Sequence, residues 1–491
     1  MRIPWIDAPS PPASGRRAIA DGLVSGAASV VAALGMRLGL GIATMPELLQ
    51  DRLIQALPGP VFSLLLNRLH YLGKPLFFAA LLVAQVFAGA ALAMLIRRTG
   101  RALPVTIGAW LVAGAVLLPL AGHAPFDGSA GVALSLALSS TAFLVALLAL
   151  WRPVAAPGAP PAARLRERRE VIAGIGLVVL GMAMARQVIG RLPSLPVLTG
   201  HLPSPITPAG DFYVVSKNLV DPTVALDGWR LAVDGLVERP LALTYQEITA
   251  LPSEEFVRTL ECISNEIGGD LISTGQFTGV PLAAVLRMAG VRPGAAVLHF
   301  TSVDGYTENM PIAKAMDPAT FLVYRLDGEP LPPKHGFPLR VLGAGTYGMK
   351  NPKWLQRIEV VTEAAEGYWT QQGWTPDAVV QTMSRIDVPG PGALASGDIP
   401  LAGIAYSGDR GIRQVEVSTD GGSTWQAAAL DPPLGPLTWV FWRLLARLDP
   451  GPGSIEVRAT DGTGAVQTEI ERDTFPDGAT GHHHVEVRVT G

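Results

Sequence analysis

The chain has 491 residues, of which 49% are hydrophobic and only 16% are charged, and its formal net charge is -3. A soluble globular chain usually carries about 25% charged residues, so we expect part of this chain to lie in lipid and the whole to form two or three domains. The slightly acidic balance argues against nucleic acid as a partner. The single cysteine, Cys262, excludes an intrachain disulfide framework and cysteine-rich zinc or iron–sulfur sites.

Five long apolar runs occupy the N-terminal part of the chain. They are residues 18–36, 75–96, 104–120, 131–151 and 171–189. Each is close to the length of about 20 residues that an α-helix needs to cross the hydrocarbon of a bilayer. We therefore predict that residues 1–192 form a transmembrane anchor of five helices.

The arginines of the N-terminal part predict the orientation of this anchor. They gather before the first run and in the second and fourth loops, as Arg2, Arg16 and Arg17, then Arg97, Arg98 and Arg101, then Arg152, Arg164, Arg166, Arg168 and Arg169. Basic loops stay in the cytoplasm, so these three segments are expected inside. The alternation of basic and non-basic loops is less clear at the first loop, which carries Arg37, Arg52, Arg68 and Lys74. Five spans then place the chain after about residue 191 outside.

The remainder of the chain alternates helical and strand-like patterns. Residues 229–233 and 296–301 predict strands and residues 282–288 a helix, whereas residues 414–418, 454–459 and 484–489 predict short strands separated by turns. We expect an α/β domain over residues 205–390 and an immunoglobulin-like β-sandwich over residues 395–491. The run His482–His484 could form a metal-binding tract, but it opens a predicted strand and we expect it on the surface.

Several motifs of the soluble part resemble the sulfite oxidase family. Residues 260–282 resemble its cysteine segment, with Asn265 three positions after Cys262, and residues 328–340 resemble its pterin-cradling segment. Residues 347–354 are similar to its phosphate-binding loop, and residues 417–425 to a turn in its C-terminal domain. The motifs occur in the family order and the resemblance covers the chain from about residue 212 to its end.

This resemblance implies a sulfite-oxidase-type α/β fold around a molybdenum–molybdopterin cofactor, with Cys262 as the metal ligand and oxygen-atom transfer as the reaction. The positions that match cofactor-binding residues of the family are Ser216, Lys217, Asn218, Cys262, Asp304, His335, Arg340, Asn351 and Lys353. Arg340 and Lys353 suit a phosphate because both offer charge-assisted hydrogen bonds. Trp374 stands where the family has its active-site tyrosine, so it is a candidate catalytic residue.

The chain departs from the family at two positions that bear on the substrate. Ser216 and Glu266 stand where sulfite oxidases have arginines. A serine and a carboxylate attract a small dianion less well than two guanidinium groups do. We therefore expect an oxyanion or a sulfoxide as the small-molecule substrate, with sulfite itself disfavoured. Bacterial branches of the family, which include reductases of sulfoxides, are the nearer resemblance.

The resemblance indicates a bacterial protein, and the predicted spans and arginine distribution then give a multi-pass protein of the inner membrane whose catalytic domain is extracytoplasmic. The predicted membrane part has only His70 and His123, both in loops, so no pair of haem ligands is expected inside the helix bundle. Electrons would then be exchanged with a separate carrier, such as a cytochrome or a membrane haem protein.

Two kinds of alternative stay open from the sequence. Each site residue has a structural reading: Cys262 as a small buried side chain, His335 as a core histidine, Asp304 as a turn residue, and Lys350 with Lys353 as a solvated pair. The whole domain could also be a non-catalytic binding or assembly module that retains the fold. The grouping of Cys262 with His335, Arg340 and Lys353 in family order favours the enzyme.

Overall fold

A computed structural model of the chain describes residues 15–40, 44–55, 73–101, 105–109, 130–150, 200–218, 221–390, 392–395 and 397–490. These residues fall into two compact units. The N-terminal unit is helical, and the described residues from 200 onward form a unit of mixed sheets, short helices and a β-sandwich.

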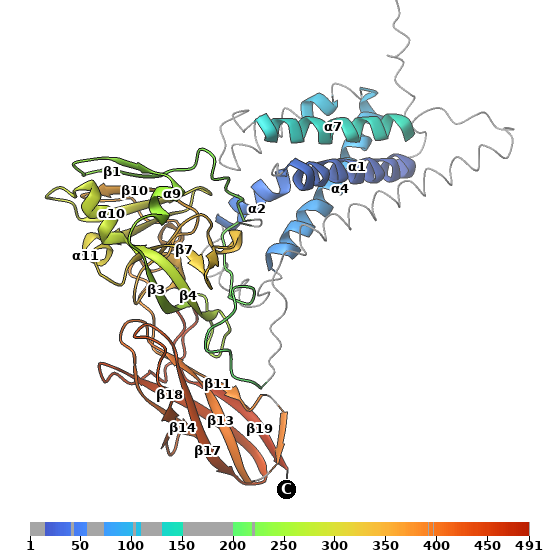
Figure 1. The fold of residues 1–491 in the computed structure, drawn as a ribbon. Coiled ribbons are helices and arrows are strands. Elements are labelled where there is room, and N and C mark those ends of the chain that lie inside the picture. Colours follow the sequence, from blue (N-terminus) through green and yellow to red (C-terminus); the bar gives the residue numbers. More distant parts are fainter. Residues whose placement is uncertain are drawn as a thin grey trace, which may run out of the picture. The chain divides into compact units, whose positions relative to one another are not determined.

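The N-terminal unit contains the helices α1 (Gly15–Leu40), α2 (Met45–Gln55), α4 (Gly73–Thr99) and α7 (Ala130–Leu150) (Figure 1). Of these, α1, α4 and α7 coincide with predicted membrane runs, whereas α2 lies in the first predicted loop. Helices α1, α4 and α7 share a small core to which Ala18, Ala93 and Phe143 contribute. The termini of α1 and α4 meet, since a Cβ on Gly15 would lie 3.6 Å from Nη1 of Arg97. The two helices are therefore antiparallel.

Glycines bring the backbones of α1 and α4 into contact. A Cβ built on Gly22 would lie 2.6 Å from Cα of Ala90, and one on Gly26 would lie 2.6 Å from the carbonyl oxygen of Val86. Gly89 on α4 faces both glycines. The spacing of Gly22 and Gly26, four residues apart on one helix face, is typical of closely packed membrane helices. Gln85 adds an interhelical hydrogen bond by donating to Ser29 at 3.0 Å.

Large apolar side chains point outward from these helices. Phe87 is 62% exposed, Val145 61% and Val83 53%. Within the described residues, two helices are long and apolar enough to cross a membrane, over Gly15–Leu38 and Leu76–Thr99. The expectation of five spans is therefore met only in part.

The other three predicted spans are less completely described. Helix α7 coincides with the fourth, and its described apolar stretch is the shorter Leu138–Leu147. Of the third span, residues 105–109 are described and are helical. The fifth, residues 171–189, lies outside the described residues.

Two sheets build the α/β part of the C-terminal unit. The first has the strand order β2-β1-β10-β5-β6, and the second has the order β3-β4-β7-β8 with β9 also paired to β7. The strands of the first are β1 (Leu231–Gly235), β2 (Leu241–Leu243), β5 (Val297–Ser302), β6 (Thr307–Pro311) and β10 (Leu355–Val361). Those of the second are β3 (Glu254–Glu261), β4 (Ile272–Pro281), β7 (Phe321–Leu326), β8 (Glu329–Pro330) and β9 (Arg340–Leu342).

Short helices cover these sheets, and their ends follow local sequence signals. They are α9 (Tyr245–Thr249), α10 (Leu282–Ala289) and α11 (Ile312–Ala315). Thr244 and Glu247 form a reciprocal capping box that begins α9. Gly290 ends α10 because it adopts the left-handed φ of 71° that a helix terminus of this type requires. The buried face of α10 packs into the main core with Leu231, Phe300 and Ile358 of the first sheet.

Residues 383–490 form a β-sandwich of two sheets, with orders β11-β13-β17-β16 and β12-β19-β18-β14-β15 (Figure 1). Its strands are β11 (Met383–Val388), β12 (Gly392–Ala395), β13 (Gly397–Tyr406), β14 (Ile412–Ser418), β15 (Gln426–Ala427), β16 (Ala429–Leu430), β17 (Val440–Leu448), β18 (Gly451–Asp461) and β19 (His483–Thr490). Trp442 is fully buried between the sheets with Leu401 and Val457. Alternate residues of β18 are buried, as one face of a sandwich requires.

The sandwich is joined to the α/β part by specific hydrogen bonds. The backbone N–H of Trp439 donates to Thr259 Oγ1 at 2.8 Å, and the hydroxyl of Tyr406 donates to the carbonyl of Thr259 at 3.1 Å. Thr259 lies on β3, three residues before Cys262. The sandwich therefore fixes the position of β3, the strand that leads to Cys262, through these two hydrogen bonds.

The structure confirms the predicted β-rich C-terminal part and the predicted elements β1, β5, α10, β14, β18 and β19 within three residues at each end. It corrects one expectation. His482 is buried, 7% exposed, and bonds to Glu456 at 2.7 Å, and His483 is half-buried, so of this run only His484 is exposed. His482 and His483 are therefore occupied by structural contacts. No group of three or more His, Cys, Asp or Glu that could hold a metal occurs among the described residues.

Candidate functional site

Cys262 lies directly after β3, at the start of a tight loop that returns to β4. Its backbone N–H donates to the carbonyl of Leu271 at 2.9 Å, and its own carbonyl accepts from the N–H of Asn265 at 2.9 Å. The side chain of Asn265 closes the loop, since Oδ1 accepts from Leu271 N–H at 2.9 Å and Nδ2 donates to Glu261 at 2.9 Å. Asn265 therefore shapes the loop that presents the thiol.

The thiol of Cys262 is buried, with 7% of the residue exposed. Burial raises the pKa of this thiol to about 11, although the backbone N–H and hydroxyl of Ser264 donate to it and Lys353 lies within electrostatic range. The neighbouring carboxyl of Glu261 has a pKa raised by burial to about 8. Without a further positive group the sulfur stays protonated. A metal cation supplies such a charge and deprotonates a coordinating thiol.

A buried arginine and a partly buried lysine flank Gly336 near this sulfur. A Cβ on Gly336 would lie 3.0 Å from Cβ of Lys353 and 3.2 Å from Cβ of Arg340, so the glycine permits the two cationic residues to approach each other. Lys353 donates to the carbonyls of Val215 at 3.2 Å and Lys334 at 3.0 Å. Arg340 donates through one Nη to the carbonyl of His335 at 3.2 Å.

Arg340 is only 6% exposed, yet it forms no ion pair with the acidic residues of the described chain, and its buried Nε has no hydrogen-bond partner. Burial lowers the pKa of its guanidinium to about 10, so it remains charged at neutral pH. A buried, charged and incompletely bonded arginine is costly unless an anion completes it. The site therefore fits the phosphate of a pterin cofactor.

His335 lies beside this arginine as a neutral ring. Burial, helped by the charge of Arg340, lowers its pKa to about 3. Its Nε2 lies 3.0 Å from the carbonyl of Ala209, which can only accept, so Nε2 carries the proton and Nδ1 is left as an acceptor. A neutral acceptor suits hydrogen bonding to a pterin N–H.

The predicted residues Ser216, Lys217, Asn218 and Asp304 form a second group. The amide of Asn218 donates to Asp304 at 2.8 Å, and Lys217 Nζ lies 3.6 Å from the same carboxylate. Ser216 Oγ accepts from the N–H of Asn218 at 3.2 Å. The bond from Lys353 to Val215 links this group to the cations around Gly336. Asp304 also accepts from Tyr306 N–H at 3.1 Å, so its role as a turn residue holds as well.

Asn351 and Lys350 support the loop between β9 and β10. Asn351 is 2% exposed and accepts from Gly343 N–H at 2.7 Å, which indicates a structural role in this loop. Lys350 forms a buried ion pair with Glu308, with Nζ 2.5 Å from Oε1 and side-chain exposures of 9% and 0%. The alternative reading of Lys350 and Lys353 as a solvated pair is therefore excluded for Lys350.

Trp374 is 3% exposed and packs in a core cluster that includes Ile263, the neighbour of Cys262. Its ring meets Phe475 edge-on, with centroids 5.2 Å apart, and its buried Nε1 has no hydrogen-bond partner. No contact of Trp374 with Cys262 itself is observed among the described residues.

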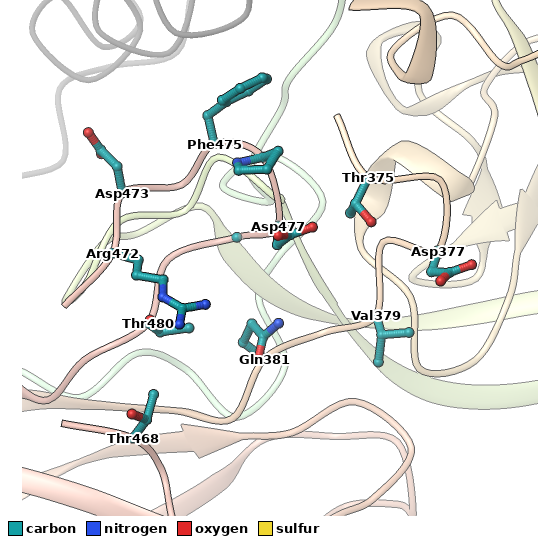
Figure 2. Close-up of a pocket in the computed structure, with 12 residues that line it drawn as sticks. Thr375, Asp377, Val379, Gln381, Thr468, Arg472, Asp473, Phe475, Asp477 and Thr480 are labelled. Atoms are coloured by element: carbon teal, nitrogen blue, oxygen red, sulfur yellow. The ribbon is translucent and has the colours of Figure 1, made fainter. Parts of the chain in front are cut away.

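A surface pocket of 460 Å³ lies beside Trp374, between the segment 375–381 and the segment 468–480 of the sandwich (Figure 2). Its charged lining residues are Asp377, Asp473, Asp477 and Arg472. Phe475, whose ring touches Trp374, forms part of the wall.

Tyr347 contacts two residues of this pocket. Its hydroxyl accepts from the N–H of the pocket residue Gln381 at 3.1 Å, and a Cβ on the pocket residue Gly478 would lie 2.4 Å from that oxygen. The same hydroxyl lies within electrostatic range of Cys262 and Glu261, and burial raises its pKa well above the usual value. Tyr347 therefore belongs both to the surroundings of the pocket and to those of the thiol.

Sequence reasoning missed several residues of this site. Tyr213 lies close to both Cys262 and Arg340, and burial raises its pKa well above the usual value. It belongs to none of the motifs that resemble the family, so the sequence carried no signal for it. Tyr347 opens the predicted phosphate-binding segment, and its place in that motif was the available signal.

Comparisons with known proteins agree with this geometry. A family model described as an oxidoreductase molybdopterin binding domain matches residues 218–369, and one described as a Mo-co oxidoreductase dimerisation domain matches residues 384–475. A crystal structure of the sulfane dehydrogenase SoxCD from Paracoccus pantotrophus is 26% identical with a TM-score of 0.54, and the match covers 61% of this chain and 86% of that one.

Curated relatives match the same part of the chain. Mitochondrial sulfite oxidase of Mus musculus is 32% identical over 291 residues, which are 50% of this chain and 53% of that protein. Sulfite oxidase of Gallus gallus is 30% identical over 316 residues, 54% of this chain and 68% of that protein. An NAD(P)H nitrate reductase of Hordeum vulgare is 30% identical over 57% of this chain and 38% of its own length. The chain thus spans about half the length of the mammalian relatives that it matches.

Proposed function

Because this chain belongs to the sulfite oxidase family of molybdopterin oxidoreductases, we propose that it catalyses oxygen-atom transfer with Cys262 as the protein ligand of molybdenum. The observation that carries the proposal is Arg340, buried and charged with an unbonded Nε beside Lys353. Buried polar groups of folded proteins are normally hydrogen-bonded or paired. The buried Arg258 donates to two carbonyls and packs on aromatic rings, whereas Arg340 donates to one carbonyl only. An anion completes Arg340, and the phosphate of molybdopterin is the anion that the family binds.

The cofactor, when bound, supplies a metal that exchanges an oxygen atom and two electrons with the substrate. The protein supplies the rest. The thiolate of Cys262 holds the metal, Arg340 and Lys353 neutralise the phosphate, and His335 accepts a hydrogen bond through Nδ1. The group of Ser216, Lys217, Asn218 and Asp304 adds further donors and acceptors for the pterin.

The pocket beside Trp374 is our candidate route for the substrate. Tyr347, which accepts a hydrogen bond from the pocket residue Gln381, also lies within electrostatic range of Cys262. Three aspartates and one arginine line the pocket, which lowers the local concentration of a dianion such as sulfite. With Ser216 and Glu266 in place of arginines, this lining favours a neutral oxygen donor or acceptor, such as a sulfoxide, over an oxyanion. Electrons then pass to or from a separate carrier such as a cytochrome.

We also propose that the helices of the N-terminal unit anchor the enzyme in a bacterial inner membrane, with five spans and the molybdenum domain outside. Exposed Phe87, Val83 and Val145 suit contact with lipid. The basic ends of α1 and α4 lie together, since Gly15 meets Arg97. Arg37 at the opposite end of α1 pairs with Glu47 at 2.8 Å.

Metal analysis of the full-length protein, purified in detergent from a host that makes molybdopterin, tests the enzyme proposal. We expect stoichiometric molybdenum in the wild type and loss of dye-linked activity in Cys262→Ser. Arg340→Met should lose cofactor, whereas Arg325→Met, at an exposed arginine of the same sheet, should retain it. Wild-type protein without molybdenum would instead support a non-catalytic module.

The membrane proposal has its own tests. If alkaline carbonate releases the protein from membranes, the proposed anchoring is wrong. If protease added to spheroplasts leaves the molybdenum domain intact, the proposed outward orientation is wrong.

A further inference from the structure

The loop that carries Cys262 is held from outside by two side chains of the β-sandwich. Its far end turns at Gly268 and Gly269, which have no room for a side chain. Gly268 has a φ of +72°, and a Cβ there would lie 2.4 Å from Nε2 of His483. A Cβ on Gly269 would lie 2.5 Å from Oδ1 of Asn265. The turn therefore packs closely against Asn265 of its own loop on one side and His483 of the sandwich on the other.

Arg385, in the middle of β11, makes the second contact with this turn. Its Nη1 donates to the carbonyl of Gly269 at 2.6 Å, and its Nε donates to Asp387 at 2.8 Å, which fixes the plane of the guanidinium. The backbone of Arg385 is fixed as well, because its carbonyl accepts from Nε1 of the buried Trp442 at 3.2 Å. The arginine thus reaches the turn from a rigid strand.

The orientation of His483 is equally defined. The N–H of Ile386 donates to its Nδ1 at 3.0 Å, so the proton of the neutral ring resides on Nε2, the atom nearest Gly268. Ile386 is the neighbour of Arg385 on β11, and His483 begins β19. Two strands from the two sheets of the sandwich therefore meet at the turn.

We propose that Arg385 and His483 are positioning residues that hold the loop 262–271 in the shape in which Cys262 can bind the metal. The inference rests on the proposed function, since it takes Cys262 as the molybdenum ligand. The path is short: the turn fixes Asn265, Asn265 bonds the N–H of Leu271, and Leu271 accepts from the N–H of Cys262. A sandwich that shifts against the α/β part would displace the sulfur.

Amide hydrogen exchange of the full-length protein tests this inference without relying on activity. In cofactor-free protein, Arg385→Met and His483→Ala should each raise exchange of residues 262–271 about tenfold. The hydrogen bond from Arg385 to Gly269 and the packing of His483 against Gly268 restrain local opening of the loop. Strands β14 and β18 should exchange as in the wild type. Arg385→Lys, which keeps the charge but not the fork geometry, should restore part of the protection.

Two controls come from the same sandwich. His484→Ala removes the exposed neighbour of His483, and Arg443→Met removes an arginine whose partner is the exposed Asp431. Neither should change exchange of the loop. In loaded protein, Arg385→Met and His483→Ala should alter the electron paramagnetic resonance signature of the metal, and the controls should not.

The outcomes separate the two proposals. Unchanged exchange of residues 262–271 in both variants overturns the positioning role, even if molybdenum is bound normally. Equal increases in the controls, or faster exchange throughout β14 and β18, overturn it too, because the effect would then be general destabilisation. Wild-type protein that binds no molybdenum defeats the proposed function, whatever the exchange of the loop shows.

Discussion

The ion pair between Lys350 and Glu308 allows a quantitative prediction about the loop that precedes Asn351. The pair is buried, with an Nζ–Oε1 distance of 2.5 Å. Lys350→Met leaves Glu308 buried without its cation, which costs about 3–5 kcal/mol. In a unit of this size about 2 °C of melting temperature is lost per kcal/mol. We therefore expect a decrease of about 6–10 °C by thermal unfolding in detergent at pH 8.

The pH dependence of that loss follows from the carboxyl of Glu308. Burial raises its pKa from the ordinary value of 4.5, whereas Lys350 lowers it, so removal of the lysine raises it further. A carboxyl with a raised pKa binds its proton more tightly in the folded state. The folded state is therefore favoured at low pH and penalised as the pH rises above about 4.5. The cost of Lys350→Met should be smaller at pH 5 than at pH 8.

A second substitution separates loss of the pair from loss of packing. In Lys350→Met with Glu308→Gln no buried charge remains, so at least about 2 kcal/mol should return. The control is Arg357→Met, because Arg357 pairs with Asp234 at 3.0 Å while both are more than a third exposed. It should cost less than about 1 kcal/mol. If the single variant loses under 2 °C, or the double variant is no more stable than the single, the reasoning fails.

Three further predictions concern other parts of the chain. Gly403→Ala should lower the melting temperature of the sandwich markedly, because the new Cβ would lie 1.8 Å from the carbonyl oxygen of Arg385. Gly26→Leu should separate α1 from α4, because its Cβ would already lie 2.6 Å from the carbonyl oxygen of Val86, and crosslinking between the helices in membranes should then fall. The pKa of Asp461 is lowered to about 2 by donors that outweigh the effect of burial. The ionised carboxylate therefore stabilises the folded state above its ordinary pKa, and this contribution is lost as the pH falls toward 2. Asp461→Asn should lower the free energy of unfolding in urea by about 1–2 kcal/mol at pH 7 and by little at pH 2.

Local patterns predicted the elements whose burial is periodic. Residues 282–288 have an apolar face at helical spacing and form α10, and alternation over residues 454–459 is part of β18. The glycine contact between α1 and α4 depends on which helix faces which, and the individual runs do not carry that information. The burial of His483 depends on Gly268, more than two hundred residues earlier in the chain.

The candidate site was predicted by resemblance rather than by spacing. Ser216, Asn218 and Asp304 meet in the structure, and so do His335, Arg340 and Lys353. Nothing in the spacing of these residues indicates their convergence, because it is produced by the pairing of β7 with β9 and by long loops. The pocket beside Trp374 also required the structure, since its two walls are about a hundred residues apart in sequence.

The burial of Cys262 has a consequence for the life of the protein before it acquires metal. Oxidants and alkylating agents attack the thiolate, and at physiological pH almost all of a thiol with a pKa of about 11 is protonated. The freshly folded chain therefore carries its sole oxidisable thiol in an inert form. Under the proposed function, the thiol becomes reactive toward a metal because the metal brings its own positive charge.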